Sequence, residues 1–243
     1  YDDLNQLEDV LRRNDTAAVL IESLPATAGF PIPHNTYFKD AVELAHKYGA
    51  LYIADEVQTG LMRSGTMWCS VGYGAEPDMI VTGKGLSGGY YPMSAVIMNK
   101  RSGQWLRDDG FSQTTSFSSS ELGCYVATTV LDITSRPSTV ANVSMLTDLF
   151  STRLADIQSR HGFLTGVRQR GVIMGLELAH PQGSTALMAA LYRNGVWAMR
   201  ANFDQHVLQF KAGLLMDEST ANRVLDALDT ALPQAAAMVG VED

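Results

Sequence analysis

Three polar side chains follow short apolar runs that the sequence predicts to be buried strands. They are Glu22 after residues 17–21, Asp55 after residues 51–54, and Lys84 shortly after residues 79–82. Continuous apolar runs of this length are typical of buried parallel strands. Ligands of open α/β sheets bind outside the carboxyl ends of such strands. The spacing therefore predicts that these side chains lie along one edge of a sheet, where ligands bind.

Lys84 stands between Gly83 and Gly85, so no bulky neighbour on the chain hinders its side chain. A lysine in a cleft can form a Schiff base with an aldehyde cofactor. Pyridoxal 5'-phosphate (PLP) uses such a lysine together with an acidic partner for its ring nitrogen, and Asp55 could be that partner. The pair alone does not decide the question, because a strand-end aspartate is more often a cap and an isolated lysine is usually solvated.

Other chemistries lack the residues that they require. Gly83-Lys84 is followed by glycine rather than serine or threonine, so the chain has no P-loop. It has no Gly-x-Gly-x-x-Gly after the first strand and no Gly-x-Ser-x-Gly elbow. The five histidines show no metal-ligand spacing. A net charge of −8 argues against nucleic-acid binding. We expect no metal site and no nucleic-acid partner.

The order of the predicted elements is that of an α/β protein followed by a small α+β domain. In residues 1–135 we expect helices over 4–13, 36–48 and 122–133, with a further strand over 95–98. In residues 136–243 we expect helices over 143–157 and 185–192, strands over 172–178, 196–199 and 207–210, and a last helix that Ser219 or Thr220 caps and Pro233 ends. The boundary lies where Pro137 breaks the pattern.

Two long motifs resemble the signature of class III PLP-dependent aminotransferases. Residues 55–60 read Asp-Glu-Val-Gln-Thr-Gly, and residues 76–89 carry Pro77-Asp78 and then Thr82-Gly83-Lys84. The interval between Asp55 and Lys84 matches the family's spacing, and a weaker similarity extends over the whole chain. The resemblance implies the C-terminal half of a fold-type-I large domain (residues 1–135) plus the small C-terminal domain (residues 136–243).

The resemblance also implies roles for single residues. Lys84 matches the Schiff-base lysine, which shuttles the substrate proton, and Asp55 matches the partner of the ring nitrogen. Val57 would pack on one face of the ring, and Gln58 would reach the ring hydroxyl. In the family a threonine binds the cofactor phosphate of the neighbouring subunit. Ser116 aligns with that threonine and keeps the hydroxyl, Thr115 is a rival, and a plain Ser/Thr loop is the alternative reading.

The chain departs from the family pattern at its beginning. It opens at Tyr1 without an initial methionine, and the resemblance implies that this start lies inside the large domain. The family's phosphate loop and its ring-stacking aromatic residue lie before the segment that matches Tyr1. We therefore expect part of a larger enzyme, completed by a separate chain or shortened by truncation. A homodimer, or an assembly with a chain that supplies the missing N-terminal half, follows from the resemblance.

A second departure concerns the substrate. Many members carry an arginine near the C-terminus that binds a substrate carboxylate through two hydrogen bonds. Gln209 occupies that position, and Thr27 replaces a glutamate that gates the arginine in some members. Lys211 could substitute as a point charge, or it is simply solvated. We predict an ω-amine or aldehyde substrate on a larger scaffold rather than a plain α-amino acid.

Two other readings stay open. An aminomutase, epimerase or decarboxylase would keep the same lysine and aspartate, and a non-catalytic half-enzyme could serve as a structural partner subunit. The two cysteines are too few for a disulfide framework and fit a reducing cytoplasm. No apolar run reaches about 18 residues, so no membrane span is expected.

Overall fold

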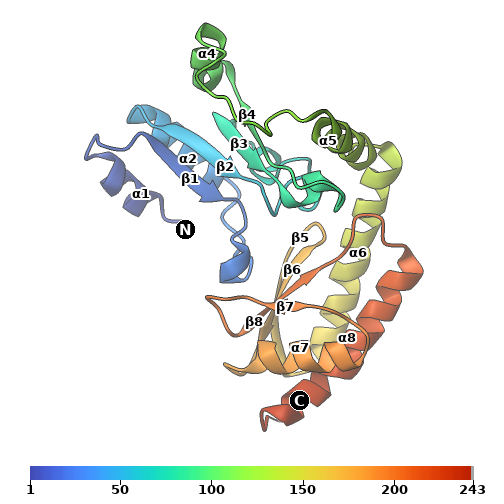
Figure 1. Cartoon of the computed structure of the whole chain (residues 1–243). Helices are drawn as coiled ribbons and strands as arrows, with labels where there is room; N and C mark the ends of the chain where they lie inside the picture. Colours follow the sequence, from blue (N-terminus) through green and yellow to red (C-terminus); the bar gives the residue numbers. More distant parts are fainter. Residues whose placement is uncertain (242–243) are drawn as a thin grey trace. The chain divides into compact units, whose positions relative to one another are not determined.

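A computed structural model describes residues 1–241, which form two compact units (Figure 1). The first unit comprises residues 1–23, 33–62 and 66–136, and the second comprises residues 24–32, 63–65 and the chain from 137 onward. Two short loops from the first half of the chain thus belong to the second unit. That residues 1–135 are part of a PLP-binding large domain and residues 136–243 a small domain stays a prediction.

The first unit is built on a four-stranded sheet in the order β1-β2-β3-β4. Its strands are β1 (Ala18–Glu22), β2 (Leu51–Asp55), β3 (Met79–Thr82) and β4 (Ala95–Met98). The first three are parallel, and β4 runs antiparallel to β3. The carboxyl ends of β1, β2 and β3 therefore share one edge of the sheet, which confirms the α/β fold and brings together the three predicted strand ends.

The helices of this unit are α1 (Leu4–Leu11), α2 (Tyr37–Lys47), α3 (Cys69–Gly72), α4 (Lys100–Asp108) and α5 (Glu121–Thr134). Helix α2 packs against β2 and buries Phe38, Ala41 and Ala45, the apolar stripe that the sequence shows. Helix α5 begins where the Ser120 hydroxyl accepts a hydrogen bond from the Gly123 N–H, at 3.2 Å. Helix α4 was not predicted.

The second unit pairs an antiparallel sheet, in the order β5-β6-β8-β7, with three helices. The strands are β5 (Leu164–Arg170), β6 (Ile173–Leu178), β7 (Met199–Arg200) and β8 (Val207–Lys211), and the helices are α6 (Pro137–Arg160), α7 (Gly183–Arg193) and α8 (Glu218–Met238). Its core includes Phe150, Leu154, Leu187, Leu208, Leu225 and Leu228, which are all fully buried.

Several predicted boundaries in this unit are wrong. Pro137 begins α6 rather than breaking it, because proline lacks only an N–H that the first helical turn leaves unpaired. Asp217, and neither Ser219 nor Thr220, caps α8 by accepting from the Thr220 N–H. Pro233 lies inside α8, which continues because Ala235 and Ala236 beyond it are buried. Strand β5 was missed, and β7 is shorter than the predicted 196–199.

Candidate functional site

The register of two neighbouring strands places Asp55 and Lys84 at the same edge of the first unit's sheet. Asp55 is the last residue of β2 and pairs with Val81 on β3. Strand β3 ends one residue later, and Lys84 is the first residue of a short 3₁₀ helix, η2 (Lys84–Ser87). The prediction that the strand ends bring these two residues to one edge is therefore confirmed by the topology.

Asp55 is held through its backbone and through one carboxylate oxygen. Its carbonyl accepts a hydrogen bond from the Ser23 N–H, at 3.2 Å, which ties it to the end of β1. Its Oδ1 accepts from the Val57 N–H at 3.0 Å. Among the described residues, Oδ2 has no partner. The half-buried carboxylate thus has a fixed orientation and one oxygen available for a ligand.

Lys84 has a left-handed backbone, with φ at +43°. Residues other than glycine rarely adopt this backbone conformation, and those that do are more frequent at functional sites than elsewhere. The helix η2 is held in place by Leu86, which is buried against Leu61 and Ala127. Within residues 1–241 the exposed Lys84 ammonium makes no hydrogen bond and no ion pair. The lysine is fixed at its base and free at its tip.

Val57 and Gln58 lie on the turn that follows β2, and both are half-buried. Val57 Cγ1 lies 3.8 Å from the point where a Cβ would stand on Gly83, so the turn reaches the residue before Lys84. The Gln58 amide has no hydrogen-bond partner among the described residues. Thr82, two residues before Lys84, buries a hydroxyl that likewise has no partner in the part of the chain described. This edge of the sheet therefore holds several polar groups without partners.

Thr115 and Ser116 lie on an exposed loop between α4 and α5. Thr115 lines a hollow of about 500 Å³ together with Ser94, Ser118, Ser120 and Cys124, among others. Its hydroxyl already accepts from the Ser118 N–H at 3.0 Å. Ser116 does not line this hollow. The hollow adjoins the site, because Ser94 Cβ lies 3.5 Å from the Cβ position of Gly83. The phosphate-binding role of either residue stays a prediction.

The predicted substrate residues Gln209 and Lys211 belong to the second unit, on β8. Gln209 is buried, and its Nε2 donates to the Arg200 carbonyl at 3.3 Å. Lys211 Nζ donates to Gln209 Oε1 at 2.9 Å and lies 5.9 Å from the centre of the Phe30 ring. The glutamine amide is thus used by neighbours in its own unit, and Lys211 is not a freely solvated residue.

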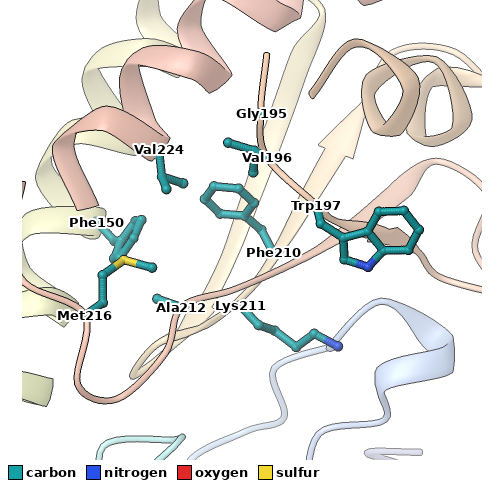
Figure 2. A pocket seen from close by; sticks show the side chains of 9 residues that line it. All are labelled: Phe150, Gly195, Val196, Trp197, Phe210, Lys211, Ala212, Met216 and Val224. Atoms are coloured by element: carbon teal, nitrogen blue, oxygen red, sulfur yellow. The ribbon is translucent and has the colours of Figure 1, made fainter. Parts of the chain in front are cut away.

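A cavity of about 200 Å³ lies beside Lys211, between α6, α8 and β8. Most of its lining is apolar and includes Phe150, Phe210 and Met216. Figure 2 shows the Lys211 ammonium directed away from these rings. Lys211 is the charged residue in this cavity's lining, and its ammonium end does not point toward the apolar side chains.

Sequence reasoning missed Glu56, which lies between Asp55 and Val57. Its carboxylate is buried and accepts five hydrogen bonds from groups on three segments of the first unit. The sequence shows no local signal for this cluster, since the donors lie between 3 and 33 positions away along the chain.

Comparison with known proteins assigns the chain to a family. The family described as aminotransferase class-III matches residues 2–232. The chain therefore belongs to the class III aminotransferases, a family that depends on PLP.

Particular relatives support the same assignment. An uncharacterized aminotransferase of Archaeoglobus fulgidus is 37% identical over 219 residues, which cover 90% of this chain and 52% of that protein. The acetylornithine aminotransferase of Pseudomonas putida is 30% identical over 96% of this chain and 56% of its own length. The structure of ornithine delta-aminotransferase from Plasmodium falciparum superposes with a TM-score of 0.87 at 26% identity, over 97% of this chain and 60% of its own.

The chain spans about half the length of the curated relatives that it matches. No helix within residues 1–241 has the length and apolar character that crossing a membrane would require.

The side chains at the edge of the first unit's sheet fit PLP. An ammonium without a partner suits the aldehyde, and a carboxylate with one free oxygen suits a ring nitrogen. The unpartnered Gln58 amide can bond a further polar group of a ligand. Lys84 and Asp55 would hold the cofactor, and Val57 would lie against it.

Proposed function

We propose that this chain carries the lysine-bearing part of the active site of a PLP-dependent aminotransferase that works by ping-pong transfer. Two observations together support this most strongly. Asp55 pairs with the β3 residue that lies three positions before Lys84, and Lys84 itself has a left-handed backbone conformation. Backbone strain of about 1–3 kcal/mol persists only where surrounding structure holds it. A lysine with a free ammonium and a carboxylate with a free oxygen follow two neighbouring strand ends at the same edge of the sheet, and this supports the proposal.

Each residue has a distinct task in this proposal. When bound, PLP supplies an aldehyde for amino-group transfer and a ring that accepts electrons. Asp55 Oδ2 holds a proton on the ring nitrogen. Lys84 Nζ would hold the cofactor and, once it is released as a free amine, would move a proton to and from the carbon that bears the amino group. Val57 keeps one ring face dry, and Gln58 bonds the ring hydroxyl.

We propose further that the substrate is an ω-amine or an aldehyde rather than a plain α-amino acid. Gln209 carries no charge and cannot form the two parallel, charge-assisted hydrogen bonds that arginine makes with a carboxylate. Its amide is already bonded to Arg200 and Lys211. The name of the Plasmodium falciparum relative, a delta-aminotransferase, likewise describes transfer at an amino group remote from the α-carbon.

A panel of amino donors tests the substrate proposal in the assembled enzyme. We expect terminal amines to be used at least tenfold faster than glutamate. Gln209→Arg should narrow this gap by restoring a guanidinium, whereas Gln209→Ala should leave glutamate a poor donor. Strong turnover of glutamate and 2-oxoglutarate that Gln209→Ala leaves undiminished would contradict the proposal.

We propose that the activity needs the polypeptide that the longer relatives carry in addition, either in the same protein or as a separate chain, and that the assembly is dimeric. Among the described strands, β1 and β4 each pair on one side only. Leu20 in the middle of β1 is 62% exposed, and Val96 and Ile97 on β4 are also exposed. Unpaired, apolar edge strands normally gain a cover. Light scattering of the purified protein, with and without such a chain, tests this proposal.

A further inference from the structure

The Glu56 carboxylate is an unusually well-bonded group in the first unit. It is 1% exposed. Oε1 accepts from the Ser23 hydroxyl (2.9 Å), the Ser70 hydroxyl (2.8 Å) and the Ser70 N–H (2.7 Å). Oε2 accepts from the Thr59 hydroxyl (2.5 Å) and the Cys69 N–H (3.0 Å). Two oxygens that accept five hydrogen bonds are saturated, so this carboxylate has no capacity left for a ligand.

The donors come from three separate segments. Ser23 follows β1, Thr59 lies on the turn after β2, and Cys69 and Ser70 form the first turn of α3. The backbone of Glu56 adds two more bonds: its N–H donates to Val81 on β3 at 2.9 Å, and its carbonyl accepts from the Gly60 N–H at 3.0 Å. One residue thus connects β1, β3, α3 and its own turn.

The residues on either side of Glu56 are those that face the candidate cofactor site. The orientation of the Asp55 carboxylate depends on the turn, because Oδ1 accepts from the Val57 N–H. Ser23 connects Asp55 and Glu56, because its N–H donates to the Asp55 carbonyl and its hydroxyl donates to the Glu56 carboxylate. A change in the Glu56 side chain would therefore be transmitted to Asp55, Val57 and Gln58 through a few bonds.

We infer that Glu56 is a positioning residue for cofactor binding: it holds the 55–58 turn so that Asp55 and Gln58 present their free polar atoms in a fixed geometry. This inference rests on the proposed function. Misplacing a reacting group by about 1 Å can cost a factor on the order of 100, so a buried anchor one residue from Asp55 controls affinity and chemistry without touching the ligand.

The test uses Glu56→Gln in the assembled enzyme. Glutamine keeps the size of the side chain, but its amide nitrogen would face N–H and O–H donors. Asp78→Asn is the matched control, because Asp78 is also a 1%-exposed carboxylate that binds several donors. It lies just before β3, at the opposite end of the strand from Lys84. Ser70→Ala, which removes one hydroxyl donor from Glu56, is a milder third variant.

Three quantities are measured: the dissociation constant for PLP, the pH dependence of the bound cofactor's visible absorption band, and the urea midpoint. We expect Glu56→Gln to weaken PLP binding about tenfold or more and to displace the pH profile of the band. Ser70→Ala should change the PLP affinity and the pH profile in the same direction as Glu56→Gln, but to a smaller extent. Asp78→Asn should lower the urea midpoint while it keeps the wild-type affinity and pH profile.

Equal changes in affinity and pH profile for Glu56→Gln and Asp78→Asn would reduce Glu56 to a residue of general stability and overturn the inference. Wild-type values in both Glu56→Gln and Ser70→Ala would also overturn it. If Glu56→Gln fails to fold, Ser70→Ala alone decides. A wild-type protein that binds no PLP would instead contradict the proposed function itself.

Discussion

The two ends of the first unit's sheet both contain a buried carboxylate, but they differ in what is left unpaired. At the amino end, Asp78 accepts hydrogen bonds from the Tyr52 N–H, from Asn99 and from His46. At the carboxyl end, Glu56 is saturated in the same way, yet its neighbours Asp55 and Gln58 keep polar atoms without partners. At the amino end the hydrogen-bonded carboxylate stabilises the fold. At the carboxyl end the hydrogen-bonded carboxylate supports neighbouring groups that are left free for a ligand.

The backbone shows the same contrast. Before β2, at the amino end, the chain turns with φ at +79°, and this position is Gly49, which adopts that conformation without strain. At the carboxyl end Lys84 has φ at +43°, and Leu61 and Met62 also have positive φ values. The turn before β2 thus uses a glycine, whereas Lys84 keeps a side chain in the strained conformation, which is typical of functional sites.

The largest expected effect is on catalysis at the carboxyl end. Lys84→Ala should reduce transamination by a factor on the order of 10⁴ or more, because it removes the group that binds the cofactor and moves the proton. The free energy of unfolding should stay within about 0.5 kcal/mol of the wild-type value, because the exposed ammonium makes no internal bond. Steady-state rates and denaturation curves of the two proteins check this. A variant that retains more than a tenth of the activity would remove Lys84 from the mechanism.

A smaller effect, on stability alone, is expected at the amino end. Asp78→Asn should lower the free energy of unfolding by about 2 kcal/mol, since a buried donor loses its acceptor. The ratio kcat/KM per folded molecule should stay near that of wild type. Urea denaturation followed by circular dichroism measures the first quantity, and assays well below the transition measure the second. A loss of kcat/KM with little change in stability would erase the distinction between the two ends.

The same carboxylate predicts how stability depends on pH. Burial by itself raises the pKa of Asp78, but the hydrogen bonds from Tyr52, His46 and Asn99 outweigh it and hold the pKa below its ordinary value. A lowered pKa contributes stability that is present above the unfolded-state value of about 4 and is lost as the pH falls through the folded-state value. The difference in unfolding free energy between wild type and Asp78→Asn should therefore shrink as the pH falls below about 4. A difference that grows as the pH falls below about 4 would refute this assignment.

The smallest effect concerns strain. Lys84→Gly should unfold with a free energy about 1 kcal/mol higher than that of Lys84→Ala, since glycine relieves the left-handed conformation. Both variants should be inactive, so differential scanning calorimetry of the pair isolates the backbone term. Equal melting temperatures would show that the turn at Lys84 carries no strain.

Much of the site follows from the sequence, because it depends on local patterns. Short apolar runs end at Asp55 and just before Lys84, and parallel pairing of β2 with β3 brings those ends together. The left-handed conformation of Lys84 was not foreseen, although glycines on both sides are compatible with a tight turn. Glu56 was missed because its donors on Ser23, Cys69 and Ser70 meet only after the chain folds.

The fold was predicted well where burial is periodic and poorly where it is not. Strand β5 was missed because most of its residues are only half-buried and it contains two arginines and a glutamine. Helix α4 is largely polar, with Ser102 as its buried residue, so it shows no strong apolar stripe. Proline usually ends a helix, so the sequence predicts that the last helix stops at Pro233. Packing of Ala235 and Ala236 overrides that preference in α8.

Reductive trapping tests the central claim most directly. The assembled enzyme is incubated with PLP, treated with borohydride to fix any lysine–cofactor bond as a stable secondary amine, digested, and mapped by mass spectrometry. The account predicts one pyridoxyl-phosphate label, on the peptide that contains Lys84, and its loss in Lys84→Ala. A label on another lysine, or no label on a protein that binds PLP, would contradict it.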